Sequence, residues 1–270
     1  MTGVQTCALP ISALAAVALF AAAPGQQTFG AVQAAAHALA AAIENDNVRA
    51  LRAILGPEGA SIVDSGDPAQ DRTVRARLAR LSEEKVQVAQ SAADRATILL
   101  GNAEQPYPVP LVFDGERWRF DSVAGAAAVL PRRIADNERT AIEVCRAYWQ
   151  AQGDYRNAHG GGEYAAKLQD LSGESPNPGL FARAVGAMFL RGAKPAPYNG
   201  YNFRLLKPEG DRLPPLLGFP AAYAVSGIRT FIVDRDPVVY GQDLGADTAA
   251  FARKPARVTL GDNWKPVNLQ

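Results

Sequence analysis

Cysteine and histidine are scarce in this chain, and their scarcity limits the metal chemistry that the protein can support. The 270 residues include two cysteines and two histidines: Cys7, Cys145, His37 and His159. Zinc sites use clustered cysteine and histidine ligands, whereas here the histidines are not paired and only Cys145 is taken as genuine, as argued below. We interpret His37 as a residue of an alanine-rich helix and His159 as a solvated residue of a glycine loop. The sequence therefore predicts no metal site.

Motifs for catalysis and for nucleotide binding are also missing. The chain has no G-x-S-x-G turn, no Walker loop and no G-x-G-x-x-G after a strand, and no Ser-Lys or Cys-His pair can be argued. The glycine run at residues 160–162 follows a predicted helix rather than a strand. Cys145 lies in a predicted amphipathic helix, where a lone cysteine is usually a small core residue. We therefore expect no catalytic residue, no cofactor-binding residue and no cofactor, and we do not expect an enzyme.

Charge of neither sign is in large excess. The chain has 28 Lys and Arg residues against 27 Asp and Glu residues, which gives a net charge of +1. Nucleic-acid binding proteins need a surplus of basic residues to neutralise phosphates. The balance argues against nucleic acid as the main partner. The partner is otherwise unknown, and other envelope proteins are the class that we consider.

Two groups of residues remain as candidates for binding. Asp234, Asp236 and Asp243 lie near predicted turns, with Asp247 beyond them, and calcium prefers several oxygen ligands from one loop. Their spacing does not match an EF-hand, so we interpret them as solvated turn residues and a cap for the last helix, and calcium binding stays open. The larger aromatic residues have the spacing of helix or strand cores, which favours a core role over a sugar platform: Tyr107, Trp118, Tyr148, Trp149, Tyr201 and Tyr240.

The amino terminus combines two distinct segments. Residues 1–12, MTGVQTCALPIS, resemble a translated sequencing-library adapter, so Cys7 is taken as an artefact; a genuine unusual leader is the alternative. Residues 13–23, ALAAVALFAAA, are followed by Pro24 and Gly25, as in the hydrophobic region and small-residue end of a secretory signal peptide. This apolar run is too short to span a bilayer comfortably. We therefore expect a periplasmic or secreted protein with no transmembrane segment in the mature chain.

Hydrophobic periodicity predicts a first α+β unit over residues 26–125. Three helices come first, and an antiparallel sheet follows. The expected elements are helices at residues 28–44 and 48–55, a helix from Pro68, and strands at residues 86–89, 96–100, 111–113 and 117–120. This order resembles a cystatin-like or NTF2-like layout, an analogy of fold that carries no function.

Local signals define the third helix and the last hairpin of this unit. Asp67 is the expected helix cap, and Gln70 is expected to reach back as in a capping box. The helix then carries an apolar stripe of Val74, Leu78 and Leu81. Asp114 and Gly115 predict a two-residue hairpin turn, after which Trp118 and Phe120 face the core and Arg117 and Arg119 face water.

A second α+β unit is predicted over residues 126–270. Its centre is a four-stranded antiparallel meander within residues 199–245, where apolar and polar residues alternate. We expect a long amphipathic helix at residues 131–152 to pack on the meander face that carries Tyr201 and Phe203, with residues 172–192 outside this layer. Pro220 predicts an edge or bulged second strand, because proline cannot donate to a ladder. The layout resembles the globular part of pilins.

Several segments of the chain, in this order, resemble segments of a known family: QQTFGAVQAAAHALAAAIENDNVRALRAILGPEG, PYPVPLVFDGERWRFDSVAG, RRIADNERTAIEVCRAY, YNGYNFRLL and GFPAAYAVSGIRTFIVDRDPVVYGQDLGADTAA. In these segments the chain resembles the DUF2950 family of exported bacterial proteins, from about residue 26 to the end. The function of that family is unknown, so the resemblance implies no catalytic or binding residues. The chain departs from the family pattern at residues 172–179, at residues 206–216 and at Pro237.

Three functions are compatible with these observations. The leading hypothesis is an exported envelope protein that acts by binding or assembly without catalysis. The alternative is a small-ligand-binding protein that uses a cone-shaped pocket in the first unit. A hydrolase with an unusual site is the third interpretation. A deep apolar pocket between the first helices and Trp118 would favour ligand binding, whereas an exposed apolar patch on the meander would favour assembly.

Overall fold

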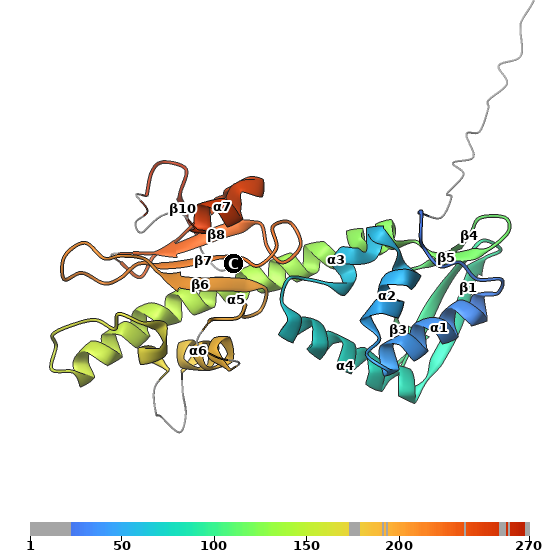
Figure 1. Ribbon diagram of the computed structural model, residues 1–270, viewed down its shortest axis with the longest axis horizontal. Coiled ribbons are helices and arrows are strands. Elements are labelled where there is room, and N and C mark those ends of the chain that lie inside the picture. Colours follow the sequence, from blue (N-terminus) through green and yellow to red (C-terminus); the bar gives the residue numbers. More distant parts are fainter. Residues whose placement is uncertain are drawn as a thin grey trace, which may run out of the picture.

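The structure confirms an α+β protein with two antiparallel sheets. The computed structural model describes residues 23–172, 179–190, 192, 194–234, 236–253, 258 and 260–267. The predicted adapter segment and nearly all of the predicted signal segment, at residues 1–22, lie outside the described residues. The long helix α5 (Ser122–Ala158) runs along the molecule and joins its two halves (Figure 1).

The first half contains the predicted helices followed by the predicted sheet. Its helices are α1 (Val32–Glu44), α2 (Val48–Leu55), the 3₁₀ helix η1 (Pro57–Gly59), α3 (Ala60–Val63) and α4 (Pro68–Glu84). Its strands are β1 (Val86–Ala92), β2 (Arg95–Leu100), β3 (Gln105–Pro106), β4 (Leu111–Phe113) and β5 (Trp118–Phe120). The sheet order is β1-β2-β4-β5, and β3 pairs with β2. The short elements η1, α3 and β3 were not predicted.

The first hydrophobic core lies between these helices and this sheet. Leu39 of α1 and Ile98 of β2 are buried in it together with Phe120 of β5. The Phe120 ring meets the rings of Phe29 and Tyr107 edge to face, at centroid distances of 6.3 and 6.4 Å. Such pairs add to the stabilisation from burial. They attach the segment before α1 to the sheet.

The predicted cap of α4 is confirmed, whereas the predicted capping box is wrong. Asp67 Oδ1 accepts hydrogen bonds from the backbone N–H groups of Ala69 and Gln70, each at 3.1 Å. The Gln70 side chain does not reach back, because its Nε2 donates to Asn137 Oδ1 of α5 at 2.8 Å. A tertiary hydrogen bond has therefore replaced the local one.

The β4–β5 turn also differs from its prediction. Asp114 Oδ1 accepts hydrogen bonds from the N–H groups of Glu116 and Arg117, and Asp114 N donates to Arg117 O at 3.1 Å. The loop therefore contains four residues, with Gly115 at φ +104°, and the two-residue turn is wrong. The prediction that Arg119 faces water is also wrong, because this residue is buried.

Helix α5 is longer than the predicted helix at residues 131–152. It starts after Asp121, whose Oδ1 accepts from Ala124 N at 3.1 Å, and Pro131 therefore lies inside the helix. A proline inside a helix removes one backbone hydrogen bond. Contacts with the first half flank this position: Ser122 Oγ donates to Leu55 O at 2.6 Å, and Arg133 Nη1 donates to Ser61 O at 2.6 Å. These tertiary contacts hold the helix where local sequence favours a start.

The second sheet is the predicted meander with one additional strand. It contains β6 (Tyr201–Leu205), β7 (Leu216–Pro220), β8 (Arg229–Val233), β9 (Val239–Asp243) and β10 (Lys265–Pro266), in the order β10-β9-β8-β7-β6. The prediction that β7 is an edge or bulged strand is wrong, because β7 lies between β8 and β6 and pairs with both in a continuous register. Its pairing with β8 ends at Gly218, two residues before Pro220, so the ladder to β8 needs no N–H group from the proline.

Helices cover both faces of this sheet. On one face, Ala141, Cys145 and Tyr148 of α5 are buried with Tyr201, Phe203 and Phe231, which confirms the predicted packing of the long helix. Helix α6 (Leu180–Phe189), which follows the 3₁₀ helix η2 (Leu168–Leu171), buries Phe181, Val185 and Met188 in the same core. The prediction that residues 172–192 lie outside this layer is therefore wrong for α6. On the other face, the 3₁₀ helix η3 (Gly245–Asp247) leads into α7 (Thr248–Arg253), and Ala252 and Trp264 pack on Leu217 and Ile232.

We predict that Tyr148→Ala lowers the free energy of unfolding by roughly 3–5 kcal/mol, because it leaves a large cavity in the second core. The Tyr148 side chain is fully buried, its ring lies 5.2 Å from that of Phe181, and its hydroxyl donates to Pro214 O. Urea denaturation measures the change. Tyr155→Ala on the same helix is the control, since Tyr155 is only half-buried. Equal losses in the two variants would contradict the packing described.

A polar junction connects the two halves beside α5. Asn137 Nδ2 donates to Ser226 O in the β7–β8 loop at 2.9 Å, and Asp67 Oδ2 accepts from Gly200 N at 2.9 Å. Gly200 has φ +74°, and a Cβ atom there would lie 2.2 Å from Asn137 Nδ2, so only glycine fits. The predicted division into two domains at residues 125 and 126 stays a prediction, and that boundary falls inside α5.

We predict that Asp67→Asn destabilises the protein by roughly 1–3 kcal/mol, because it loses the hydrogen bond from Gly200 N while it keeps the cap of α4. Asparagine caps helices about as well as aspartate, so the start of α4 should be retained. The asparagine amide has only one acceptor oxygen, so it cannot accept hydrogen bonds both from the backbone N–H groups of α4 and from Gly200 N. Thermal unfolding compares the variant with Asp67→Ala, which loses the cap as well and should be less stable still. Wild-type stability in Asp67→Asn would show that the Gly200 contact contributes nothing.

Candidate functional site

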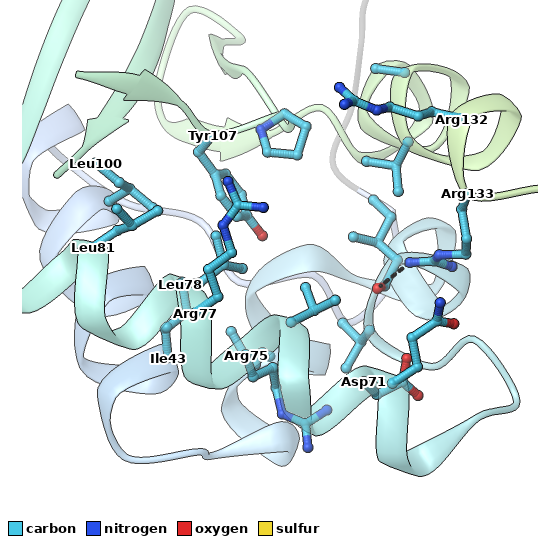
Figure 2. A pocket seen from close by; sticks show the side chains of 18 of the residues that line it. Ile43, Asp71, Arg75, Arg77, Leu78, Leu81, Leu100, Tyr107, Arg132 and Arg133 are labelled. Carbon is cyan, nitrogen blue, oxygen red and sulfur yellow. Dashed lines mark hydrogen bonds between the residues drawn. The ribbon is translucent and has the colours of Figure 1, made fainter. Parts of the chain in front are cut away.

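A cleft of about 510 Å³ opens in the first half between α4 and the first turns of α5 (Figure 2). Side chains of α1 and α2 form its base, and the end of β2 together with β3 and the residues after it closes one side. The cleft thus lies in the unit where a ligand pocket was predicted. Tyr107 rather than Trp118 contributes the aromatic wall.

Apolar side chains form most of the cleft surface. The predicted stripe of α4 faces it, and the base adds residues of the first core: Val74, Leu78 and Leu81 from α4, with Ile43, Leu51, Leu55 and Leu100. Val74 keeps 50% of its surface exposed, and Ser82 is the only residue of α4 that is buried. An amphipathic helix normally buries its apolar stripe against another element. Here Leu78 and Leu81 pack partly against the first core while they also line the cleft, and Val74 remains open to it.

Arg133 and Asp71 form a half-buried charged region at the α5 side. Arg133 donates to Ser61 O at 2.6 Å and to Ile62 O at 3.1 Å, which holds its guanidinium against α3. Burial lowers the pKa of Arg133, and the charge of Asp71 opposes that change. Burial raises the pKa of Asp71, although its carboxylate accepts two hydrogen bonds from Ser65 N. These two groups carry opposite charges at the same side of the cleft.

Three further arginines line the cleft, and their partners differ. Arg75 pairs with Asp46 in the α1–α2 turn. Arg77 donates to the neutral amide oxygen of Gln105 at 3.2 Å. Arg132 lies 4.0 Å from Asp136, and 90% of its side chain is exposed. Since Asp71 and Asp136 are the acidic residues of the lining, the positive charge there exceeds the negative charge.

Two polar side chains complete the cleft. Burial raises the pKa of Tyr107 above its usual range, so its phenol stays neutral. Gln70 lines the cleft next to Asn137, and its Oε1 is buried without a hydrogen-bond partner. A buried acceptor without a donor is unfavourable. A bound water or a donor group of a ligand would satisfy it.

The residues considered from sequence do not gather at this cleft, apart from Tyr107. His37 is exposed on α1, and His159 stacks on Tyr155 at the end of α5, with ring centroids 4.0 Å apart. Tyr148 and Tyr201 are buried in the second core, as predicted, and Trp118 is buried in the first. The sequence did contain one signal for the cleft, since the stripe of α4 was recognised. What the stripe faces was not visible from sequence.

The aspartates considered for calcium do not converge on one position. Asp236 Oδ1 accepts from Val238 N before β9, Asp243 Oδ1 accepts from Gly245 N after it, and Asp247 ends η3. Asp234 and Asp236 line a second pocket of about 570 Å³ together with Lys207 and Arg212. Within the part of the chain that the structure describes, no three residues among His, Cys, Asp and Glu are grouped to hold a metal ion.

Cys145 lies fully buried between α5 and the second sheet. Burial raises the pKa of its thiol to about 12, which removes the thiolate that reacts as a nucleophile. We predict that Ellman's reagent modifies Cys145 only after the protein unfolds. The assay uses a Cys7→Ser background so that one thiol is counted. Rapid modification of the folded protein would contradict the burial described.

Comparisons with known proteins place the chain in a family without identifying its activity. Among the described residues, no helix has both the length and the apolar character needed to cross a membrane. A search of curated proteins found no match, and a search of solved structures found none either. The model of one family, described as a protein of unknown function (DUF2950), matches residues 26–267. The chain therefore belongs to the DUF2950 family, as its sequence segments indicated.

Proposed function

We propose that this protein is an exported bacterial protein that binds a small molecule without transforming it, and that the cleft between α4 and α5 is the binding site. The observation that carries this proposal is the mostly apolar lining of an open cleft, in which Val74 of the α4 stripe is half exposed and Leu78 and Leu81 are only partly buried. Small-molecule sites are typically concave, roughly 300–1,000 Å³ in volume, and lined by apolar residues with a few polar groups. The cleft has these properties.

The surface of the meander supports ligand binding over assembly. Both faces of the second sheet are covered, one by α5 and α6 and the other by α7 and Trp264. Across the described residues, the large apolar side chains with high exposure are Val74, Val123 and Leu190, and none belongs to this sheet. A broad apolar patch for a protein partner is therefore not present on the sheet as described.

Two parts of this proposal, export and the lack of catalysis, are supported by the amino-acid sequence. The apolar segment at residues 13–23 has the composition of a signal peptide. The motifs of the common nucleophilic and nucleotide-binding enzymes do not occur in the chain. The groups that line the cleft suit recognition, because Arg133 is held by two backbone carbonyls and Tyr107 is neutral.

We predict that the protein binds Nile red, a neutral apolar dye, and that Val74→Trp lowers this binding because the larger ring fills the cleft. Val74 is half exposed, so the substitution should leave the core unaltered. Dye fluorescence gives the affinity, and circular dichroism checks the fold.

Val123→Trp is the matched control for this experiment. Val123 lies on α5, is 64% exposed and does not line the cleft. Its variant should bind the dye as the wild type does. If the wild type does not bind the dye, or if the two tryptophan variants bind it equally, the cleft is not a binding site for apolar molecules.

A further inference from the structure

The two ends of the cleft differ in polarity. Leu81 of α4 and Leu100 of β2 lie together at one end, with Leu78 and Ile43 next to them, whereas Arg132 and Arg133 lie at the α5 side (Figure 2). Asp71 and Leu81 are ten positions apart on α4, which corresponds to roughly 15 Å along the helix. Arg77 lies between them, one residue before Leu78. The cleft is therefore long enough to hold an apolar chain at the leucine end and a polar group near its middle.

The charged groups of the lining favour an anion over a cation. Four arginines and two aspartates line the cleft, and one arginine, Arg75, is already paired with Asp46 outside the lining. Arg77 donates to the neutral amide of Gln105, so its charge has no acidic counterpart in that hydrogen bond. Guanidinium groups bind carboxylates and phosphates through two parallel hydrogen bonds, and these charge-assisted bonds are stronger than neutral ones.

We propose that the cleft binds a single-chain amphiphile with an anionic head, a carboxylate or a phosphate, whose alkyl chain lies along Leu78, Leu81 and Leu100. The inference rests on the proposed function and specifies its ligand class. Arg77 on α4 and Arg132 on α5 contact the head from the two walls of the cleft. Arg133 keeps its hydrogen bonds to α3 and contributes its charge from the side.

Asp71 explains why the head should sit nearer to Arg77 than to Arg133, and Asp136, which lies 4.0 Å from Arg132 in the same lining, makes Arg132 the weaker of the two contacts. Its carboxylate is held by Ser65 N and lies on the same side of the cleft as Arg133. A second anion beside it would be repelled. The unpartnered Gln70 Oε1 is close to this region as well, and it requires a donor rather than an anion. The Asp71 carboxylate and Gln70 Oε1 therefore direct the anionic head away from the end of the cleft next to Asn137.

The test measures displacement of Nile red by ligands that share one chain length and differ in the head. Decanoate and decyl phosphate should displace the dye at about tenfold lower concentration than 1-decanol, the advantage expected for charge-assisted hydrogen bonds. Decyltrimethylammonium should be weaker than 1-decanol. Acetate and inorganic phosphate, which lack the chain, should not displace the dye.

Charge variants locate the head. Arg77→Gln should remove most of the advantage of decanoate over 1-decanol and Arg132→Gln should remove part of it, while both leave the binding of 1-decanol unchanged. Arg80→Gln is the matched control, because Arg80 is an exposed arginine of α4 that does not line the cleft. Retention of the full advantage in both cleft variants would overturn the assignment of the head.

The outcomes separate the ligand class from the proposed function. If 1-decanol and decanoate displace the dye equally, or if the ammonium ligand is the strongest, the anionic class is wrong and binding of apolar molecules stands. If acetate or phosphate displaces the dye as well as the long-chain ligands do, the alkyl chain has no role and the amphiphile is wrong. If the wild type binds neither the dye nor any decyl ligand, the proposed function fails together with the ligand class.

Discussion

The side-chain amide of Asn137 links the two halves of the molecule, and the positions of the other elements depend on it. Its Oδ1 accepts from Gln70 Nε2 at 2.8 Å, and its Nδ2 donates to Ser226 O at 2.9 Å. Because Asn137 is buried, losing either hydrogen bond would leave a polar atom without a partner. The bonds therefore set the rotation of α5 about its axis. With that rotation, Ala141, Cys145 and Tyr148 face the second sheet.

The residue after Asn137 reinforces the same arrangement from the sheet side. Glu138 is buried, and its carboxylate accepts from Ile228 N and Arg229 N at 3.0 and 2.9 Å and from the Arg229 guanidinium. A buried carboxylate is tolerated only when it is paired and hydrogen-bonded, as here. Within the two preceding turns of the same helix, Arg132, Arg133 and Asp136 line the cleft. A single helix thus forms both the packing surface of the second half and a wall of the cleft in the first.

Local patterns in the sequence predicted the elements well, and contacts between distant residues account for the differences. The cap at Asp67, the α4 stripe and the meander strands depend on neighbours along the chain or on simple alternation. The start of α5 was missed because Pro131 resembles a helix start, whereas the turns before Pro131 are held by the Asp121 cap and by the hydrogen bond from Ser122 Oγ to Leu55 O. Strand β10 was missed because two residues, Lys265 and Pro266, carry no periodicity.

The cleft illustrates the limit of sequence patterns most clearly. The spacing of Val74, Leu78 and Leu81 indicates an apolar face, but the same spacing describes a helix packed in a core. A stripe that lines a cleft differs from a stripe packed in a core only by the position of α5. That position depends on the hydrogen bonds of Asn137 and Glu138, which lie more than fifty residues away in the chain. The arginines were equally uninformative from sequence, since Arg77 and Arg80 look alike on α4 and only Arg77 lines the cleft.

The structure of α4 also suggests why an open cleft is compatible with a stable fold. The helix is capped by Asp67, Leu78 and Leu81 pack partly against the first core, and Ser82 Oγ donates to Glu44 Oε1 at 2.8 Å near its end. These contacts hold the two ends and the second half of the helix. Val74 of the same stripe is half exposed, so the position of α4 does not depend on burying this residue against protein. The stripe can therefore remain open to a ligand at Val74, because the cap, the leucines on the core and the Ser82 hydrogen bond already hold the helix.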